Sequence, residues 1–247
     1  MGNPNYELEH LENAIEYQKW VYETVLPFLG DRILEIGAGT GNISQWLPLK
    51  ERLICTEGHL PFLETLKWRL YRKHGETDKI ATFQFDVEKD FSNPAHPIWS
   101  LDIDTVISFN FLEHVKNDGD VVSNLVRLLK KSQCSGPKRI IFFVPAHQWA
   151  YGAMDENYGH FRRYDRKDFV RLQSSGGPFA ALHLLYFNIF GLIPWFFLGR
   201  VLRRKLINPS SIVLFEKLCP YFKKVDHFIH RILKIPFGQS VCAVMVL

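Results

Sequence analysis

The stretch LEIGAGTGN, residues 34–42, decides the fold predicted for this chain. It continues an apolar run that begins at residue 32 and suits a buried parallel strand. Three glycines then alternate with other residues, and glycine lets a backbone turn tightly and approach a ligand. Dinucleotide-binding turns carry Gly or Ala at the sixth position, where this chain has Asn42. The stretch therefore predicts a ligand site at the end of a strand and argues against a dinucleotide.

Apolar runs and helical patterns alternate over the first 145 residues. Strands are expected at residues 32–36, 52–57, 80–85, 103–109 and 139–144. Helices are expected at residues 7–29, 43–49, 60–74 and 119–131, the last with Asp118 as its cap. This alternation predicts an α/β fold in which helices cover both faces of a mainly parallel sheet. The composition, 47% hydrophobic and 23% charged, is that of a globular protein and excludes a disordered, collagen-like or polytopic membrane chain.

Polar side chains stand at the ends of the next three predicted strands. Glu57 ends the second strand, 20 residues after Gly37, and its carboxylate can accept hydrogen bonds from both hydroxyls of a ribose. Asp86 follows the third strand, where an adenine amino group could meet it, and Asn110 follows the fourth. Because open α/β sheets bind ligands at the carboxyl ends of their strands, these residues are expected to share one crevice.

These motifs, together with FDVE (85–88) and NFLEHV (110–115), resemble those of the class I S-adenosylmethionine-dependent methyltransferases. The resemblance implies a Rossmann-like, doubly wound sheet of seven strands with an antiparallel last strand (241–247), S-adenosyl-L-methionine as cofactor and S-adenosyl-L-homocysteine as product. The implied cofactor contacts are Tyr17, Glu35, Gly37, Ala38, Gly39, Asn42, Glu57, Gly58, Asp86, Val87, Asn110, Phe111 and His114. For Tyr17, plain helix packing is the alternative to a cofactor contact.

Segments outside this core resemble one bacterial-type branch of the superfamily. They are Tyr17 with Trp20, VPAH (144–147), YG-x-x-D (151–155), GHFRRY (159–164), Asn188 and PFGQS (236–240). The match spans most of the chain and implies a single methyltransferase domain over residues 1–247. Its parts would be an N-terminal helix (1–29), a cofactor-binding core (30–145), lid or acceptor segments that include a C-terminal helical lid (146–164 and 189–238), and the last strand (241–247).

Two histidines are candidates for a catalytic base. Methyl transfer is an in-line displacement in which an enzyme mainly aligns donor and acceptor, but a hydroxyl acceptor also benefits from a base. Histidine has a suitable pKa for this role near neutrality. His160 is the first candidate, with loop fixation as its alternative role, and His114 is the second, with packing near the cofactor as its alternative. Arg163 is expected to orient the acceptor together with His160.

The arginines of GHFRRY have two interpretations. Arg162 and Arg163 suit an anionic group on the acceptor, because guanidinium groups bind carboxylates and phosphates. The alternative is an internal ion pair with Asp155 or Glu156. No metal site is predicted, because adjacent carboxylates such as these two seldom converge with His160 on one ion.

Residues 179–198 are nearly all apolar and long enough to permit a membrane span. Because Asn188, Gly191 and Pro194 interrupt the tract, a strand up to Asn188 followed by a helix is the preferred interpretation. A basic cluster follows at residues 200–205. It predicts either contact with an anionic membrane surface or a solvated helix end.

Charge and cysteines set the expected partners and location. A dedicated duplex-binding module usually shows a denser basic face than a net charge of +4 suggests, and although this charge neither requires nor excludes nucleic acid, none is expected as a partner. The polar, acidic start is no secretory signal, and the four cysteines lack metal-ligand spacing, which favours free thiols in the cytoplasm. Peripheral contact with the inner face of the membrane is a further expectation. The sequence does not indicate an oligomeric state.

The function expected from these features is methyl transfer from S-adenosylmethionine to an oxygen of a small or lipid-like acceptor. The aromatic content of 14% and the apolar tract suggest a lipid-like molecule. Three alternatives stay open. They are carbon methylation of an apolar isoprenoid or similar acceptor, a nicotinamide-dependent dehydrogenase, and a non-catalytic membrane-surface protein that keeps a cofactor pocket.

Overall fold

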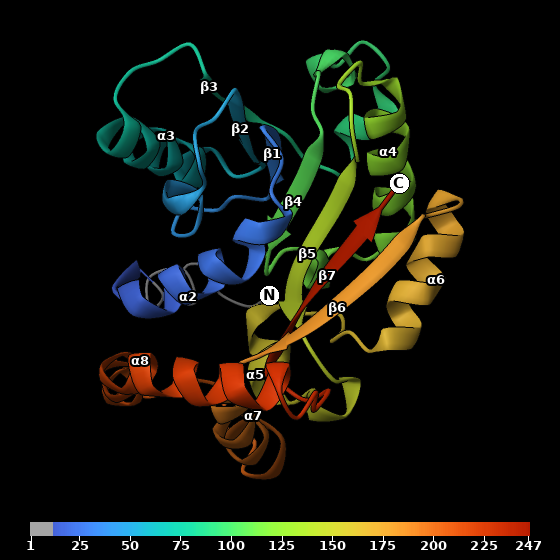
Figure 1. Ribbon diagram of the computed structural model, residues 1–247. Coiled ribbons are helices and arrows are strands. Elements are labelled where there is room, and N and C mark those ends of the chain that lie inside the picture. The colour runs from blue at the N-terminus through green and yellow to red at the C-terminus, as the bar shows by residue number, and fades with distance from the viewer. Residues whose placement is uncertain (1–11) are drawn as a thin grey trace.

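A seven-stranded sheet forms the centre of the computed structural model, which describes residues 12–247 (Figure 1). Its order, β3-β2-β1-β4-β5-β7-β6, turns back between β1 and β4, and β7 runs antiparallel to both of its neighbours. This arrangement confirms the predicted fold. The strands are β1 (Arg32–Ile36), β2 (Arg52–Glu57), β3 (Ile80–Gln84), β4 (Thr105–Phe109), β5 (Arg139–Pro145), β6 (Ala181–Phe187) and β7 (Ser240–Val246).

Helices cover both faces of the sheet. One face carries α2 (Ile15–Val25), α3 (Leu60–His74) and part of α8 (Pro209–Arg231), and the other carries α4 (Asp118–Lys131) and α6 (Arg166–Gly176) (Figure 1). Each face has its own cluster of buried apolar side chains, so the sheet lies between two cores. Burial of this apolar surface is the main favourable term in folding.

The N-terminal helix differs from its expected range. Residues 7–11 of that range lie outside the described residues. The described helix α2 begins at Ile15, and a 3₁₀ turn, η1 (Leu26–Phe28), replaces its last turn. The carboxylate of Glu216 on α8 accepts the backbone N–H groups of residue 16 and of Tyr17, the latter at 3.2 Å. Because the first N–H groups of a helix have no partner within it, Glu216 caps α2 and fixes the position of Tyr17.

The helix predicted at residues 43–49 and the cap predicted for the helix at residues 119–131 are both wrong. The first segment holds only a 3₁₀ turn, η2 (Ser44–Trp46), because Pro48 disfavours helical backbone at the residue before it, and Leu47 is extended. Helix α4 begins at Asp118 itself, and Asn117 occupies the cap position without a side-chain hydrogen bond. The carboxylate of Asp118 is engaged elsewhere, as described below.

The second half of the chain adds short helices at the carboxyl ends of the strands. The segment expected to be a loop (146–164) contains η6 (Gln148–Ala150) and α5 (Ala153–Tyr158). The apolar tract forms β6, then α7 (Ile189–Trp195) and a π turn, η7 (Phe196–Val201), as the preferred interpretation predicted. Among the described residues, no helix is long and apolar enough to span a bilayer. Three further 3₁₀ turns are η3 (Asp90–Ser92), η4 (Pro97–Ser100) and η5 (Leu112–His114).

Candidate active site

The glycine-rich turn after β1 has a backbone that only glycine readily adopts. Gly37, Gly39 and Gly41 have φ angles of 68°, 57° and 82°. A Cβ atom on Gly37 would lie 2.1 Å from a ring carbon of Phe111. Other residues disfavour positive φ, and Gly37 has no room for a side chain, so the turn keeps its backbone open toward the carboxyl end of β1.

Glu57 joins this turn to the loop that follows β2. Its Oε2 accepts the backbone N–H of Gly39 at 2.8 Å, and its Oε1 accepts the backbone N–H of His59, also at 2.8 Å. Both bonds are charge-assisted and therefore stronger than those between neutral groups. The carboxylate thus holds together the loops that follow β1 and β2, at the carboxyl ends of these strands.

A cavity of about 300 Å³ opens beside this turn, and we call it the glycine-loop cavity. It lies where the strand order turns back, the usual ligand site of open α/β sheets. The predicted residues that line it are Tyr17, Glu35, Gly37, Ala38, Gly39, Asn42, Glu57, Asn110, Phe111 and His114. The sequence analysis did not identify Gln18, Val21, Ile43, Phe62, Phe109 and Phe143, which also line it.

Three predicted cofactor residues do not line this cavity. Asp86 forms an ion pair with Lys89, and its Oδ1 accepts the backbone N–H of Glu88 at 3.0 Å. Val87 packs in the apolar core, and the carbonyl of Gly58 accepts a hydrogen bond from Gln84 at 2.8 Å. In this structure these groups stabilise the loops around the cavity and do not form part of its wall.

Glu35 is a buried acid at the floor of the glycine-loop cavity. Burial, as the main cause, and the nearby charge of Glu57 together raise the pKa of its carboxyl to about 7, against the opposing effect of hydrogen bonds from Ser44 and Cys55. Cys55 lies 3.3 Å away and donates its thiol hydrogen to this carboxyl. Glu35 is therefore a group whose ionisation changes the stability of the fold near neutral pH.

We expect Glu35→Gln to remove a large part of the pH dependence of stability. Because the folded pKa lies above the unfolded value of 4.5, ionisation of Glu35 destabilises the fold as the pH rises. The wild type should lose about 3 kcal/mol from this group between about pH 4.5 and pH 8. Urea unfolding across this range would measure the loss. The control is Glu51→Gln, which changes an exposed acid, and equal pH profiles for both variants would contradict the assignment.

A second cavity of about 230 Å³ adjoins the first and shares Tyr17 and Asn110 with it. We call it the apolar cavity, because most of its wall comes from the apolar side chains of α5, α7, α8 and their connections. Its wall also includes the polar side chains of Glu113, His160 and Arg163. Tyr17 also packs edge-on against Phe187 and Phe215. It therefore has the packing role foreseen for it and a place in the wall of both cavities.

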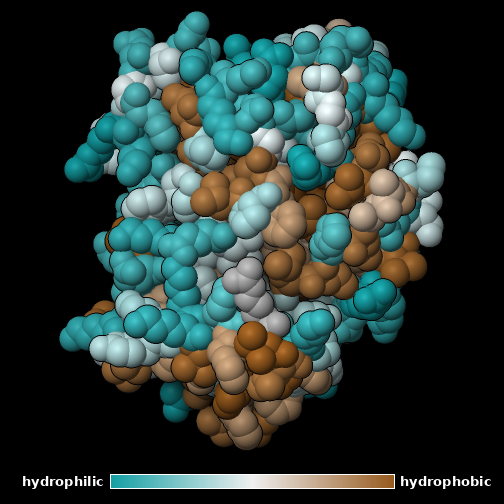
Figure 2. All heavy atoms as spheres, in the orientation of Figure 1, coloured by the Kyte–Doolittle hydropathy of each residue, from teal (hydrophilic) through white to brown (hydrophobic). Residues whose placement is uncertain are grey.

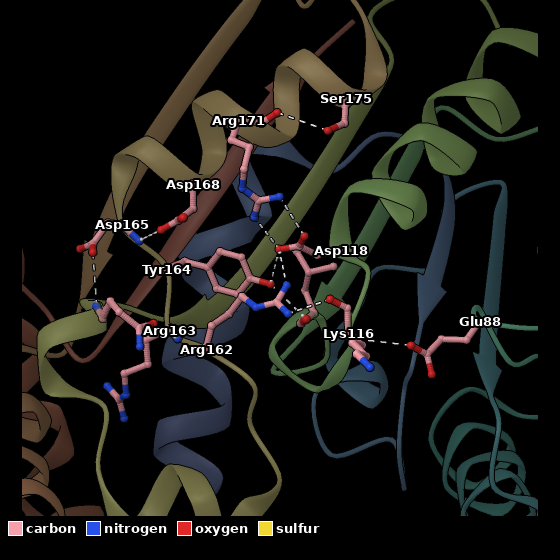
Figure 3. A network of polar contacts seen from close by, with 12 residues as sticks. Glu88, Lys116, Asp118, Arg162, Arg163, Tyr164, Asp165, Asp168, Arg171 and Ser175 are labelled. Carbon is pink, nitrogen blue, oxygen red and sulfur yellow. Dashed lines mark hydrogen bonds and ion pairs between the residues drawn. The ribbon is translucent and has the colours of Figure 1, made fainter.

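The two arginines of GHFRRY point in opposite directions (Figure 3). Arg162 reaches Asp118 at 2.8 Å, where Arg171 and the Tyr164 hydroxyl also donate hydrogen bonds. Arg163 turns the other way, to the apolar cavity. These two arginines, although neighbours in the sequence, therefore contact different parts of the molecule.

Arg163 forms the internal ion pair that was the alternative to an acceptor contact. Its Nε donates to Asp155 Oδ1 at 2.8 Å, and both side chains are almost completely buried. Nδ1 of His160 lies 3.0 Å from the same oxygen, and Trp195 Nε1 donates to Oδ2 at 3.2 Å. Burial alone would raise the pKa of Asp155, but the hydrogen bond from His160 and the charge of Arg163 lower it below its usual value. Asp155 is therefore an ionised carboxylate that fixes the ring of His160.

The two candidate histidines lie next to each other, with ring centroids 4.7 Å apart. His114 lines the glycine-loop cavity, and His160 lines the apolar cavity. Glu113, which the sequence analysis did not single out, is buried beside them, and the three residues have ligand atoms within 4.8 Å of one another. The motif NFLEHV contained Glu113, but only the fold brings it to His160.

Comparison with known proteins agrees with this architecture. A family model described as a methyltransferase domain matches residues 34–132. A SAM-dependent methyltransferase from Thermotoga maritima superposes with a TM-score of 0.56 at 13% identity, over 98% of this chain and 93% of its own. A SAM-dependent methyltransferase from Archaeoglobus fulgidus gives 0.53 at 12% identity, over 93% and 94%. No curated protein sequence matches the chain. At these identities the two structures establish the shared fold.

The glycine-loop cavity suits S-adenosylmethionine as its ligand. Gly37 and Gly39 line this cavity without side chains, and Glu57, whose carboxylate holds the two neighbouring loops, lines it as well. The aromatic rings of Phe62 and Phe111 supply flat apolar walls. With the methyltransferase-domain match over residues 34–132, these features support an enzyme that transfers methyl groups and uses S-adenosylmethionine as its cofactor.

Proposed function

We propose that this enzyme transfers the methyl group of S-adenosylmethionine to an oxygen of a small or lipid-like acceptor that binds in the apolar cavity. The observation that carries the proposal is the junction of the two cavities at Tyr17 and Asn110. A mainly apolar wall that also carries the polar side chains of Glu113, His160 and Arg163 suits an apolar acceptor with a polar group.

The residues around the junction have distinct roles in this proposal. When bound, S-adenosylmethionine supplies a methyl group on a positively charged sulfur. Gly37, Gly39 and Glu57 hold the cofactor, with Asn110 beside it. Asp155 fixes the ring of His160 through Nδ1, so that Nε2 is the nitrogen that orients the acceptor oxygen or takes its proton. Arg163 keeps Asp155 ionised, and His114 is the second candidate for the proton transfer.

The lid belongs to the same proposal. Residues 146–164 and 189–238 would close over the acceptor as parts of a single methyltransferase domain, because the wall of the apolar cavity includes residues of both segments. The GHFRRY segment and its buried contacts support membership of the bacterial-type branch that carries this motif.

The test is an assay with S-adenosylmethionine labelled in its methyl group and with lipid and small-molecule fractions as acceptors. Mass spectrometry of labelled products identifies the methylated atom. His160→Gln should lower kcat by about 100-fold or more, the usual contribution of a positioned base. His183→Gln, an exposed histidine on β6, is the matched control. Transfer of the labelled methyl group to a carbon atom of the acceptor, or full turnover in His160→Gln, would contradict the proposal.

We also propose that the enzyme is cytoplasmic and contacts the inner face of the membrane through α7, η7 and α8. Apolar side chains gather at the end of the molecule that these helices form (Figure 2). Exposed members include Ile193, Phe197, Val201, Leu202, Leu206, Val213 and Leu214. Exposed basic residues at positions 203–205 lie within this surface and suit anionic headgroups.

This surface should bind vesicles that contain phosphatidylserine better than vesicles of phosphatidylcholine alone. Changing Arg203, Arg204 and Lys205 together to glutamine should weaken binding by about 100-fold, at about 1 kcal/mol for each charge. Co-sedimentation measures the effect, and the triple change of Lys67, Arg72 and Lys73 on α3 is the control. Equal binding of both variants would exclude this surface as the contact.

A further inference from the structure

Glu113, His114 and His160 form a compact cluster of metal-ligating side chains. The first two lie on η5 after β4, and His160 follows α5, so the cluster joins two parts of the fold. One ligand atom from each lies within 4.8 Å of the others. Ligands about 2.1 Å from a shared metal are roughly 3 to 4 Å apart, so small side-chain rotations would complete the site.

The types of ligand match a particular class of ion. Two imidazoles and one carboxylate are bound by divalent transition metals such as zinc, manganese, iron and cobalt, whereas calcium and magnesium prefer oxygen ligands. Three protein ligands also leave positions open for a substrate oxygen. Glu113 and His160 are buried, so the cluster differs from the exposed acidic groups common on protein surfaces.

The surroundings of His160 are those of a metal ligand. A histidine that binds a metal through one nitrogen almost always donates its other N–H to a carboxylate or carbonyl. Nδ1 of His160 lies 3.0 Å from Asp155 Oδ1. Asp155 is itself held by Arg163, Trp195 and the backbone N–H of Gly152. This second layer of contacts fixes the ring of His160 through Nδ1, so a metal ion would bind the other nitrogen, Nε2.

The cluster also lies between the two cavities. His114 lines the glycine-loop cavity, whereas Glu113 and His160 line the apolar cavity. We propose that Glu113, His114 and His160 bind one divalent transition-metal ion, which in turn binds the acceptor oxygen. This inference rests on the proposed function and names how the acceptor is activated: the nitrogen of His160 then binds the metal instead of a proton.

The reaction balances without a further reagent. The acceptor hydroxyl releases its proton to water when its oxygen binds the cation, which lowers the pKa of that hydroxyl. A lone pair of the oxygen then forms the new O–C bond while the C–S bond of the sulfonium breaks. The sulfur keeps that electron pair, so S-adenosylhomocysteine and the methylated acceptor leave the site.

The experiment measures metal binding directly, on the full chain stripped with a chelator. Co²⁺ is titrated by its absorption bands and Mn²⁺ by electron paramagnetic resonance, each with S-adenosylhomocysteine present. We expect one ion per chain. Glu113→Gln and His114→Ala should weaken binding by more than about 100-fold, since even the loss of a contact behind a ligand costs about 10- to 100-fold. Thermal unfolding of each variant checks that it folds.

Two controls lie outside the cluster. Glu156→Gln changes an exposed acid next to Asp155, and His183→Ala changes an exposed histidine, so both should bind the metal as the wild type does. No binding of either ion by the wild type, or equal binding in Glu113→Gln, would overturn the metal site. Methyl transfer to oxygen that persists in excess chelator would also overturn it while leaving the proposed function intact. Metal binding without any methylated oxygen would instead reject the proposed function.

Discussion

Replacing Asp118 with alanine should lower the free energy of unfolding by about 3 kcal/mol, the lower end of the range for breaking a buried ion pair. The side chain of Asp118 is 5% exposed and accepts hydrogen bonds from Arg162, Arg171 and Tyr164 (Figure 3). Arg171 is 48% exposed, so water compensates part of its loss. Arg162 and the Tyr164 hydroxyl are more enclosed; they would lose the charged acceptor and keep only the carbonyls of Lys116 and Leu112.

The loss should reach the active site as well, because Asp118 anchors the segment that carries His160 and Arg163. Urea unfolding at pH 7 and the rate of methyl transfer measure the two effects. Asp120→Ala is the control, since Asp120 is exposed in the same first turn of α4 and has a similar relation to the helix dipole. Equal destabilisation by both changes would show that the dipole, and not the ion pairs, accounts for the role of Asp118.

The network also predicts how acid affects stability. Burial by itself would raise the pKa of Asp118, but its hydrogen bonds with Arg171 and Arg162 lower it below the usual 3.8. Its stabilising contribution is therefore complete at neutral pH and is lost only as the pH falls through the lowered value.

The sheet could be predicted from the sequence because each parallel strand is a short apolar run between turns. The bounds expected for β1 and β2 are those observed. The helix expected at 43–49 failed at Pro48, a local rule that overrides the apolar pattern. Helix α5 has six residues, too few to show a helical period, so its segment looked like a loop.

Some residues of the candidate site could likewise be predicted from the sequence, and others could not. Residues at strand ends, such as Glu57 and Asn110, could be placed because the topology brings all those ends to one edge. Residues from helices, such as Gln18 and Phe62, could not, since nothing local indicates which helix face meets the edge. The partners of Asp118 and the position of Glu113 beside His160 depend on contacts between distant segments, which the periodicity of a single chain does not contain.

Glu57→Ala should weaken binding of S-adenosylhomocysteine by about 100-fold or more. The change removes the acceptor of two charge-assisted hydrogen bonds, from Gly39 and His59, and so releases the two loops that form one side of the cavity. It also removes the carboxylate predicted to bind the ribose hydroxyls. Hydrogen bonds to charged groups contribute about 1.5 to 3 kcal/mol each, and about 3 kcal/mol in total corresponds to a 100-fold change in Kd.

Isothermal titration calorimetry measures this change, and Glu51→Ala, an exposed acid just before β2, is the control. Glu57→Gln separates the two contributions, because an amide keeps one accepting oxygen but presents an NH₂ group to the other backbone N–H. Its affinity should therefore lie between those of the wild type and the alanine variant. A Kd unchanged in Glu57→Ala would mean that the loops keep their positions without the carboxylate and that the ribose binds elsewhere. The glycine-loop cavity would then need a different ligand orientation from the one that Glu57 implies.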